Sequence, residues 1–93
     1  MNNYELTILL KPDLGEKEVI KEIKNLTDLL EKAGAKVSKK IEPAKKALAY
    51  EIKKFREAYY FYLELGLKPE GVAVVDQKLK LQENVVRYLL VRE

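Results

Sequence analysis

The chain has 93 residues, the usual size of one domain, of which 47% are hydrophobic and 35% charged, with a formal net charge of +3. The absence of Cys and His excludes disulfide frameworks, Cys/His zinc sites and catalysis by a thiolate or an imidazole. Because no apolar run approaches the ~20 residues of a membrane span and no signal peptide opens the chain, we expect one soluble, cytoplasmic domain over residues 1–93.

The first third of the chain predicts a strand followed by a helix. Residues 4–10 alternate apolar and polar side chains, which is the period of a strand with one buried face, and the segment around Pro12 ends it. Residues 16–33 repeat apolar positions every three or four residues, and Gly34 follows as a helix-ending glycine. This apolar stripe consists of Val19, Ile20, Ile23, Leu26, Leu29, Leu30 and Ala33.

The middle of the chain predicts two further strands. Residues 35–52 read as a long, bent edge strand, interrupted at residues 42–44 because Pro43 cannot donate a hydrogen bond to a sheet. Its expected inward side chains before the proline are Val37 and Ile41, and the alternation resumes with Leu48, Tyr50 and Ile52. Residues 53–57 are short enough to be a hairpin connection. Residues 58–67 follow as the clearest strand, with Phe61, Leu63 and Leu65 on one face and Tyr60, Tyr62 and Glu64 on the other.

The last third predicts a second helix over residues 70–82 and a final strand over residues 85–92, in which Val86, Tyr88 and Leu90 alternate with Arg87, Leu89 and Val91. With right-handed crossovers, the βαββαβ order gives a ferredoxin-like α+β sandwich. We expect a four-stranded antiparallel sheet in the order 4-1-3-2 with both helices on one face. The predicted core consists of Leu6, Ile8, Ile23, Leu26, Leu30, Val37, Leu63, Leu65, Val75, Leu79 and Leu90.

The other face of this sheet is expected to be open. Arg87 and Glu64 are poor core residues, so we assign them to the open face. Side chains that share their side of the sheet, by the two-residue period of each strand, are assigned to the same face. The expected open face therefore displays Glu5, Thr7, Leu9, Ala49, Tyr60, Tyr62, Leu89 and Val91. A contiguous apolar patch there favours a partner, either a protein or stacked bases, and the candidate protein-partner residues are Tyr60, Tyr62, Leu89 and Val91. The alternative is ordinary scattered apolar surface.

The positive charge of the chain is concentrated in its middle. Residues 31–56 carry nine Lys and Arg against three Glu, whereas the segments before and after them are each slightly negative. Such clustering is typical of a surface that neutralises a polyanion, because phosphate binding needs several cations within about 10 Å of one another. The alternative is an edge strand that its lysines protect from pairing with other sheets.

Catalytic motifs are missing from the sequence. Ser38 is the only serine and has no histidine to activate it, and no glycine-rich phosphate loop is present. The aromatic strand Glu57 to Leu63 fits only loosely the RNA-recognition pattern, because it lacks the glycines of that motif. We therefore expect no enzyme, no cofactor, no metal and no small-molecule substrate.

Four short stretches carry a family resemblance that covers nearly the whole chain. The segment Lys45 to Lys54, together with Tyr4-Glu5, Pro12 and the final-strand stretch Asn84 to Arg87, resembles the bacterial ribosomal small-subunit protein six family. The chain departs from that pattern at Glu51, where the family usually has proline, and at Asn2 and Asn3, where it tends to be basic.

The resemblance implies a structural protein of the small ribosomal subunit. It implies binding to small-subunit ribosomal RNA together with ribosomal small-subunit protein eighteen, as a heterodimer. It also maps the family's basic residues to Lys45, Lys46, Lys54 and Arg87. With Lys53 from the basic segment, these are the candidate RNA-binding residues, expected to contact phosphates. The alternative is a free-standing ferredoxin-like regulatory or RNA-recognition module that uses its open sheet face.

Overall fold

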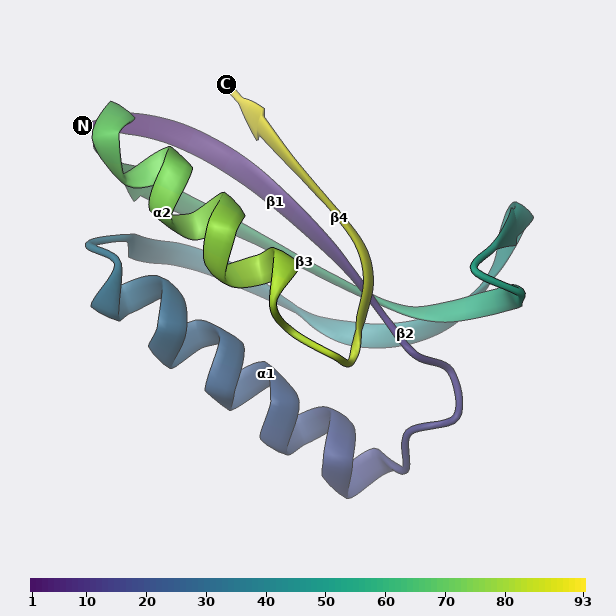
Figure 1. Ribbon diagram of the computed structural model, residues 1–93. Helices are drawn as coiled ribbons and strands as arrows, with labels where there is room; N and C mark the ends of the chain where they lie inside the picture. Colours follow the sequence, from purple (N-terminus) through teal and green to yellow (C-terminus); the bar gives the residue numbers. More distant parts are fainter.

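The computed structural model describes residues 1–93 as four strands and two helices in the order βαββαβ (Figure 1). The elements are β1 (Asn2–Leu10), α1 (Glu16–Lys32), β2 (Lys36–Ile52), β3 (Phe55–Leu67), α2 (Pro69–Lys80) and β4 (Val85–Arg92). All strand pairs are antiparallel and the sheet order is β2-β3-β1-β4, which confirms the predicted ferredoxin-like sandwich. Both helices lie on the same face of the sheet, and neither is long and apolar enough to cross a membrane.

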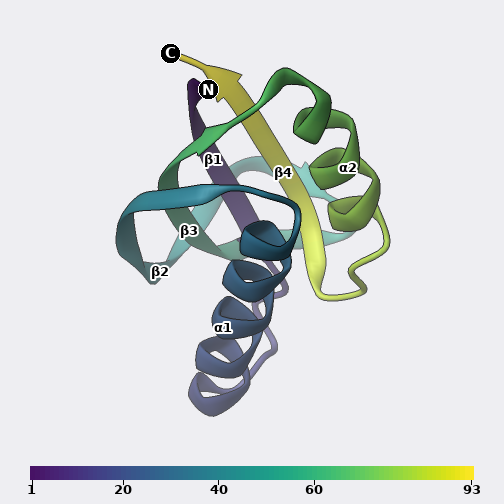
Figure 2. The same cartoon turned by 90° about the vertical axis from the view of Figure 1, so that its left-hand side faces the viewer.

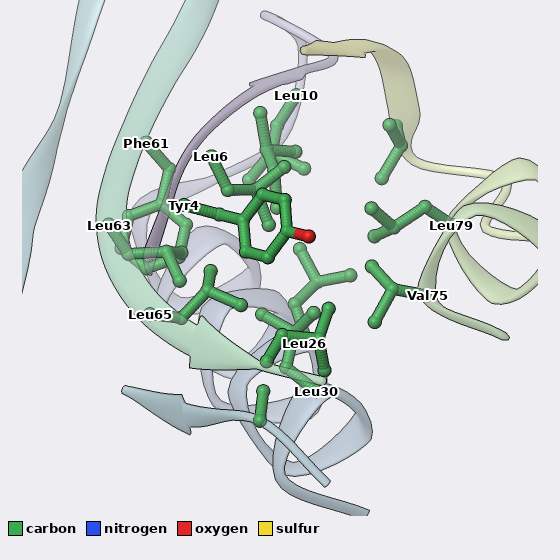
Figure 3. Packing of buried hydrophobic residues seen from close by; sticks show 14 of the residues in the cluster. Tyr4, Leu6, Leu10, Leu26, Leu30, Phe61, Leu63, Leu65, Val75 and Leu79 are labelled. Atoms are coloured by element: carbon green, nitrogen blue, oxygen red, sulfur yellow. The ribbon is translucent and has the colours of Figure 1, made fainter. Parts of the chain in front are cut away.

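The core lies between the sheet and the two helices. Alternate side chains of β1 and β3 point toward the apolar stripes of α1 and α2, as the close view in Figure 3 shows. The largest fully buried side chains are Phe61, Leu6, Ile8, Leu10, Leu26, Leu30, Leu63, Leu65, Leu67, Leu79 and Val75. Every predicted core residue belongs to this cluster, with Ile23, Val37 and Leu90 partly buried at its margin.

Ile20 departs from the predicted stripe of α1, since it is 68% exposed. The buried face of this helix is centred on Val19, Leu26 and Leu30. Each helical residue is rotated by about 100° from its predecessor, so Ile20 falls outside the sector that meets the sheet. It lines a shallow groove between α1 and the middle of β2, near Pro43 and Tyr59.

β2 runs without a break, contrary to the predicted interruption at residues 42–44. The sheet accommodates Pro43 through a shift of pairing register between Ile41 and Ala44. An earlier shift between Val37 and Lys39 inserts one residue and reverses the alternation. Ile41 therefore pairs with Tyr62, faces the open side and is 47% exposed, so its predicted inward orientation is wrong.

A second irregularity corrects the prediction for Val86. Leu10 of β1 pairs with Val85, whereas the adjacent Leu9 pairs with Arg87, which leaves Val86 as the extra residue of a bulge. Val85 joins the main core, and Val86 instead packs with Leu9 on the open side. The inward position predicted for Val86 is therefore wrong, and Val85 occupies it instead.

Beyond its bulge, β4 is fixed to the helix layer through Tyr88. The Tyr88 hydroxyl donates a hydrogen bond to the carboxylate of Asp76 on α2. Burial, followed by this hydrogen bond, raises the pKa of Tyr88 to about 12, and the same bond lowers the pKa of Asp76. Because Tyr88 is anchored on the helix side, its neighbours Arg87 and Leu89 are held on the open face.

Candidate functional site

The distal end of the β2–β3 hairpin, residues 45–58, bends over the open face of the sheet, and we call it the hairpin arm. Figure 2 shows β2 and β3 curving strongly around the straighter β1 and β4. The Arg87 guanidinium on β4 donates a hydrogen bond to the Tyr50 hydroxyl on β2, with an Nη1 to Oη distance of 3.2 Å. Since β2 and β4 are opposite edges of the sheet, this bond requires the arm to cross the face.

A small second cluster of apolar side chains lies under the arm. Leu9 packs there with Ala58 and Val86, against the partly buried Leu48, Ile52, Phe55 and Tyr60. Leu9 was expected on the uncovered surface, and this expectation is wrong because the arm leaves it only 8% exposed. The arm thus covers one end of the face and leaves the other end open.

A cavity of about 250 Å³ remains between the arm and the sheet. It is lined by Thr7, Leu9, Leu48, Ala49, Tyr50, Ile52, Tyr60, Arg87, Tyr88 and Leu89. Arg87 is the only charged residue of this lining, and its guanidinium forms no ion pair. The cavity therefore combines apolar and aromatic walls with one uncompensated positive charge.

Lys45 and Lys46 lie on opposite faces of the arm, because successive side chains of a strand alternate. Lys45 lies on the helix side, where its Nζ is 5.3 Å from the centre of the Tyr59 ring and 3.9 Å from a Glu57 carboxylate oxygen. Lys46 lies on the open side, with its Nζ 5.7 Å from the centre of the Tyr60 ring and no carboxylate partner. Of this pair, Lys46 alone offers a free charge to the open face.

Lys53 and Lys54 form the tip of the arm as a two-residue turn, so the predicted five-residue connection 53–57 is wrong. Their φ angles are 48° and 71°, a combination that Asn-Gly adopts readily and lysine does not. Backbone strain of this kind is often found at functional positions. Both side chains are exposed, so the tip holds two adjacent positive charges away from the core.

We expect the double substitution Lys53→Asn and Lys54→Gly to raise the free energy of unfolding by about 1 kcal/mol, because it relieves the left-handed backbone strain of the turn. Denaturant titration measures this gain. The matched control Lys53→Gln with Lys54→Gln removes the same charges without relieving the backbone and should change stability little. An equal gain in both variants would show that charge repulsion, not backbone strain, weakens the turn.

The four candidate protein-partner residues divide between the two ends of the open face. Tyr62 and Leu89 lie in one cross-strand row, on either side of Thr7, and Val91 lies in the next row, opposite Glu5. Leu89 is 62% exposed. Tyr60 lies in the row of Leu9, where it forms a wall of the cavity. The structure thus brings Tyr62, Leu89 and Val91 together on the uncovered end, where Leu89 also borders the cavity, and places Tyr60 under the arm.

The uncovered end of the face carries two neighbouring carboxylates, Glu5 and Glu64. The Tyr62 hydroxyl donates to the Glu64 carboxylate at 3.2 Å, and Glu5 lies directly across from Glu64 on β1. Burial, followed by the negative charges of Glu5 and Glu64, raises the pKa of Tyr62 to about 12. Tyr62 therefore stays a neutral hydrogen-bond donor at physiological pH. The carboxylates of Glu5 and Glu64 thus lie away from the arm, with Lys39 of β2 paired opposite Glu64 at the edge of the same end.

Residues 3–92 match the family model described as Ribosomal protein S6. The chain belongs to the ribosomal protein S6 family. Small ribosomal subunit protein bS6 of Desulforamulus reducens is 32% identical over 93 residues, which cover 100% of this chain and 98% of that protein. The bS6 protein of Synechococcus sp. (strain CC9605) is 37% identical over 90 residues, covering 97% and 73% of the two chains.

The fold agrees with this assignment. The crystal structure of 30S ribosomal protein S6 from Thermotoga maritima superposes with a TM-score of 0.93 at 20% identity, over 99% of this chain and 87% of that one. Membership of the S6 family makes the chain a structural protein of the small ribosomal subunit, not an enzyme, and so places it in the cytoplasm.

Within this S6-family chain, reasoning from sequence missed Tyr50 as a site residue. Its alternation with Leu48 and Ile52 was visible in the sequence. Three apolar side chains on one side of a charged edge strand indicate that this side packs against other apolar residues. The contact with Arg87 was not visible, because it depends on how far the arm bends.

Proposed function

We propose that the chain binds small-subunit ribosomal RNA through the cations of its hairpin arm, and binds ribosomal small-subunit protein eighteen through the uncovered end of its open face. The observation that carries the proposal is the charge of the arm, which holds five Lys and Arg against two Glu, while the carboxylates of Glu5 and Glu64 lie at the other end of the face. Membership of a small-subunit family supports the same assignment.

On the RNA side, Lys46, Lys53, Lys54 and Arg87 act mainly on phosphates. Lysine presents a mobile point charge on a flexible stem, which suits phosphate oxygens rather than the ordered edge of a base. Contacts of this kind fix the position of a protein on RNA and carry little sequence preference. Lys45 has a smaller part, because Glu57 already compensates its charge.

On the protein side, the surface formed by Tyr62, Leu89 and Val91 takes apolar side chains of the partner. A rigid aromatic ring flanked by aliphatic groups is the usual composition of an interface centre. The neighbouring carboxylates of Glu5 and Glu64 favour a partner that brings cationic groups to the rim of this contact.

We expect Tyr62→Ala to weaken binding of the protein partner by roughly fivefold or more, because aromatic anchors dominate interfaces of this kind. Isothermal titration calorimetry with purified protein eighteen measures the change. The control Ile20→Ala removes a more exposed apolar side chain from the helix side and should leave the affinity unchanged. Equal affinity of the Tyr62→Ala protein and the original chain would remove the open face from the interface.

Sedimentation of ribosomal particles tests the proposed function as a whole. A tagged copy of the chain, expressed in bacterial cells, should travel with small subunits on sucrose gradients in low salt and be released progressively in high salt. A free-standing regulatory module would instead stay at the top of the gradient in both conditions. That result would overturn the proposal.

A further inference from the structure

We infer that the cavity under the hairpin arm receives the base of one unpaired RNA nucleotide, whose phosphates are met by Lys46 and Arg87. The inference rests on the proposed RNA binding and adds a site to it. The arm then has two roles: its cations contact phosphates, and the cavity beneath it binds the planar ring of a base.

The dimensions and walls of the cavity suit a single ring system. Its volume is about 250 Å³, and an apolar cavity of ~150 Å³ already accepts benzene. Tyr50 stands on the arm side and Tyr60 on the sheet side, so the lining offers aromatic surface from two directions. Tyr50 is 65% exposed, which leaves its ring accessible from solvent. Bases of single-stranded RNA stack on tyrosine rings largely irrespective of sequence.

The charges around the cavity distinguish a nucleotide from an apolar side chain of a protein. The ion pairs of the molecule are Lys45–Glu57, Arg56–Glu51 and Lys80–Asp76, so Lys46 and Arg87 are free. Arg87 lines the cavity, and Lys46 lies over the ring of Tyr60, which is one of its walls. An apolar side chain would leave both cations without a counter-charge, whereas a nucleotide supplies an anion beside its ring.

The nucleotide must be unpaired. In an A-form duplex the bases are stacked inside the helix, and proteins reach base faces in loops, bulges and single strands. The bond between Arg87 and Tyr50 joins two lining residues of the cavity, one on the sheet and one on the arm. A phosphate is a stronger acceptor for a guanidinium than a phenol oxygen, so the Arg87 guanidinium is available to a phosphate of the bound nucleotide.

Methyl and backbone-amide NMR spectra of the full chain provide the test, with a short oligouridylate and an abasic oligomer of equal length as probes. Both probes should shift the backbone amides of Lys46 and Arg87. Only the oligouridylate should shift the methyl signals of Leu9, Leu48 and Ile52, which line the cavity. Methyl signals unmoved by either probe while the amides shift would overturn the inference. Methyl shifts that arise only with protein eighteen would also overturn it, and would assign the cavity to the protein partner.

Two substitutions of the exposed Tyr50 give an independent readout. Tyr50→Leu should weaken oligouridylate binding by roughly fivefold or more and leave binding of the abasic oligomer unchanged, because only stacking is lost. Tyr50→Phe keeps the ring and should bind oligouridylate almost as the original chain does. If all three proteins bind oligouridylate with equal affinity and the chain still sediments with small subunits, the pocket is refuted and the proposed function stands. Failure to bind either oligomer, together with absence from small subunits, would overturn the proposed function itself.

Discussion

Replacing Leu30 by alanine is expected to lower the free energy of unfolding by about 2–5 kcal/mol. Leu30 is fully buried on α1, in the same cluster as Leu65 of β3 and Val75 of α2 (Figure 3). The loss combines the hydrophobic transfer free energy of the removed methyl groups with the cavity that they leave. Leu79→Ala should show a loss in the same range, since Leu79 anchors α2 to the same core.

Denaturant titrations of the variants measure these losses. Ile20→Ala is the matched control on α1, because this side chain is largely exposed and its removal should cost less than about 0.5 kcal/mol. Losses of that small size for both Leu30→Ala and Leu79→Ala would contradict the packing of the helices on the sheet.

The fold could be predicted from sequence because its two hydrophobic periods are cleanly separated along the chain. Leu6 and Ile8 keep the two-residue period of β1, and Leu26 and Leu30 keep the helical spacing of α1. Right-handed crossover connections then leave few arrangements for two helices and four strands, and sheet order follows. Phe61 belongs to the same alternation, and its full burial agrees with its position opposite Ile8.

Two errors of side-chain orientation arose where a strand gains one residue. Ile41 and Val86 were assigned by counting alternate positions, and in each case a bulge lies between the counted residue and its reference. A bulge needs no special residue type, so alternation alone cannot locate it. Pro43 did mark one such place, but the sheet responds to it with a shifted register and not with a break.

The candidate site was only partly visible in the sequence. The basic segment and the open-face residues could be found from charge and alternation, and Arg87 and Glu64 do face the open side. The two-residue period of a strand also implies that Lys45 and Lys46 point to opposite faces. The sequence interpretation treated them as one basic pair and overlooked this. The cover over Leu9 depends on the curvature of the arm, a property of tertiary packing that no local pattern encodes.

Replacing Lys46, Lys53 and Lys54 together by glutamine is expected to flatten the salt dependence of RNA binding by about 2–3 units of log–log slope, because each phosphate contact contributes roughly 0.7–0.9. Affinity should fall most at low salt, where counterion release contributes most. The choice between RNA sequences should change little, because contacts to phosphates carry no sequence information directly.

The measurement that tests the account most directly compares this variant with one of equal charge. The control replaces Lys17, Lys21 and Lys24 by glutamine, three exposed lysines of α1 on the opposite side of the sheet. Binding to small-subunit ribosomal RNA is titrated across a range of salt concentrations with protein eighteen present. The account predicts a flatter slope for the arm variant and an unchanged slope for the control. Equal slopes for the original chain and the arm variant would contradict it, and would leave the basic segment as the solvated edge of a sheet.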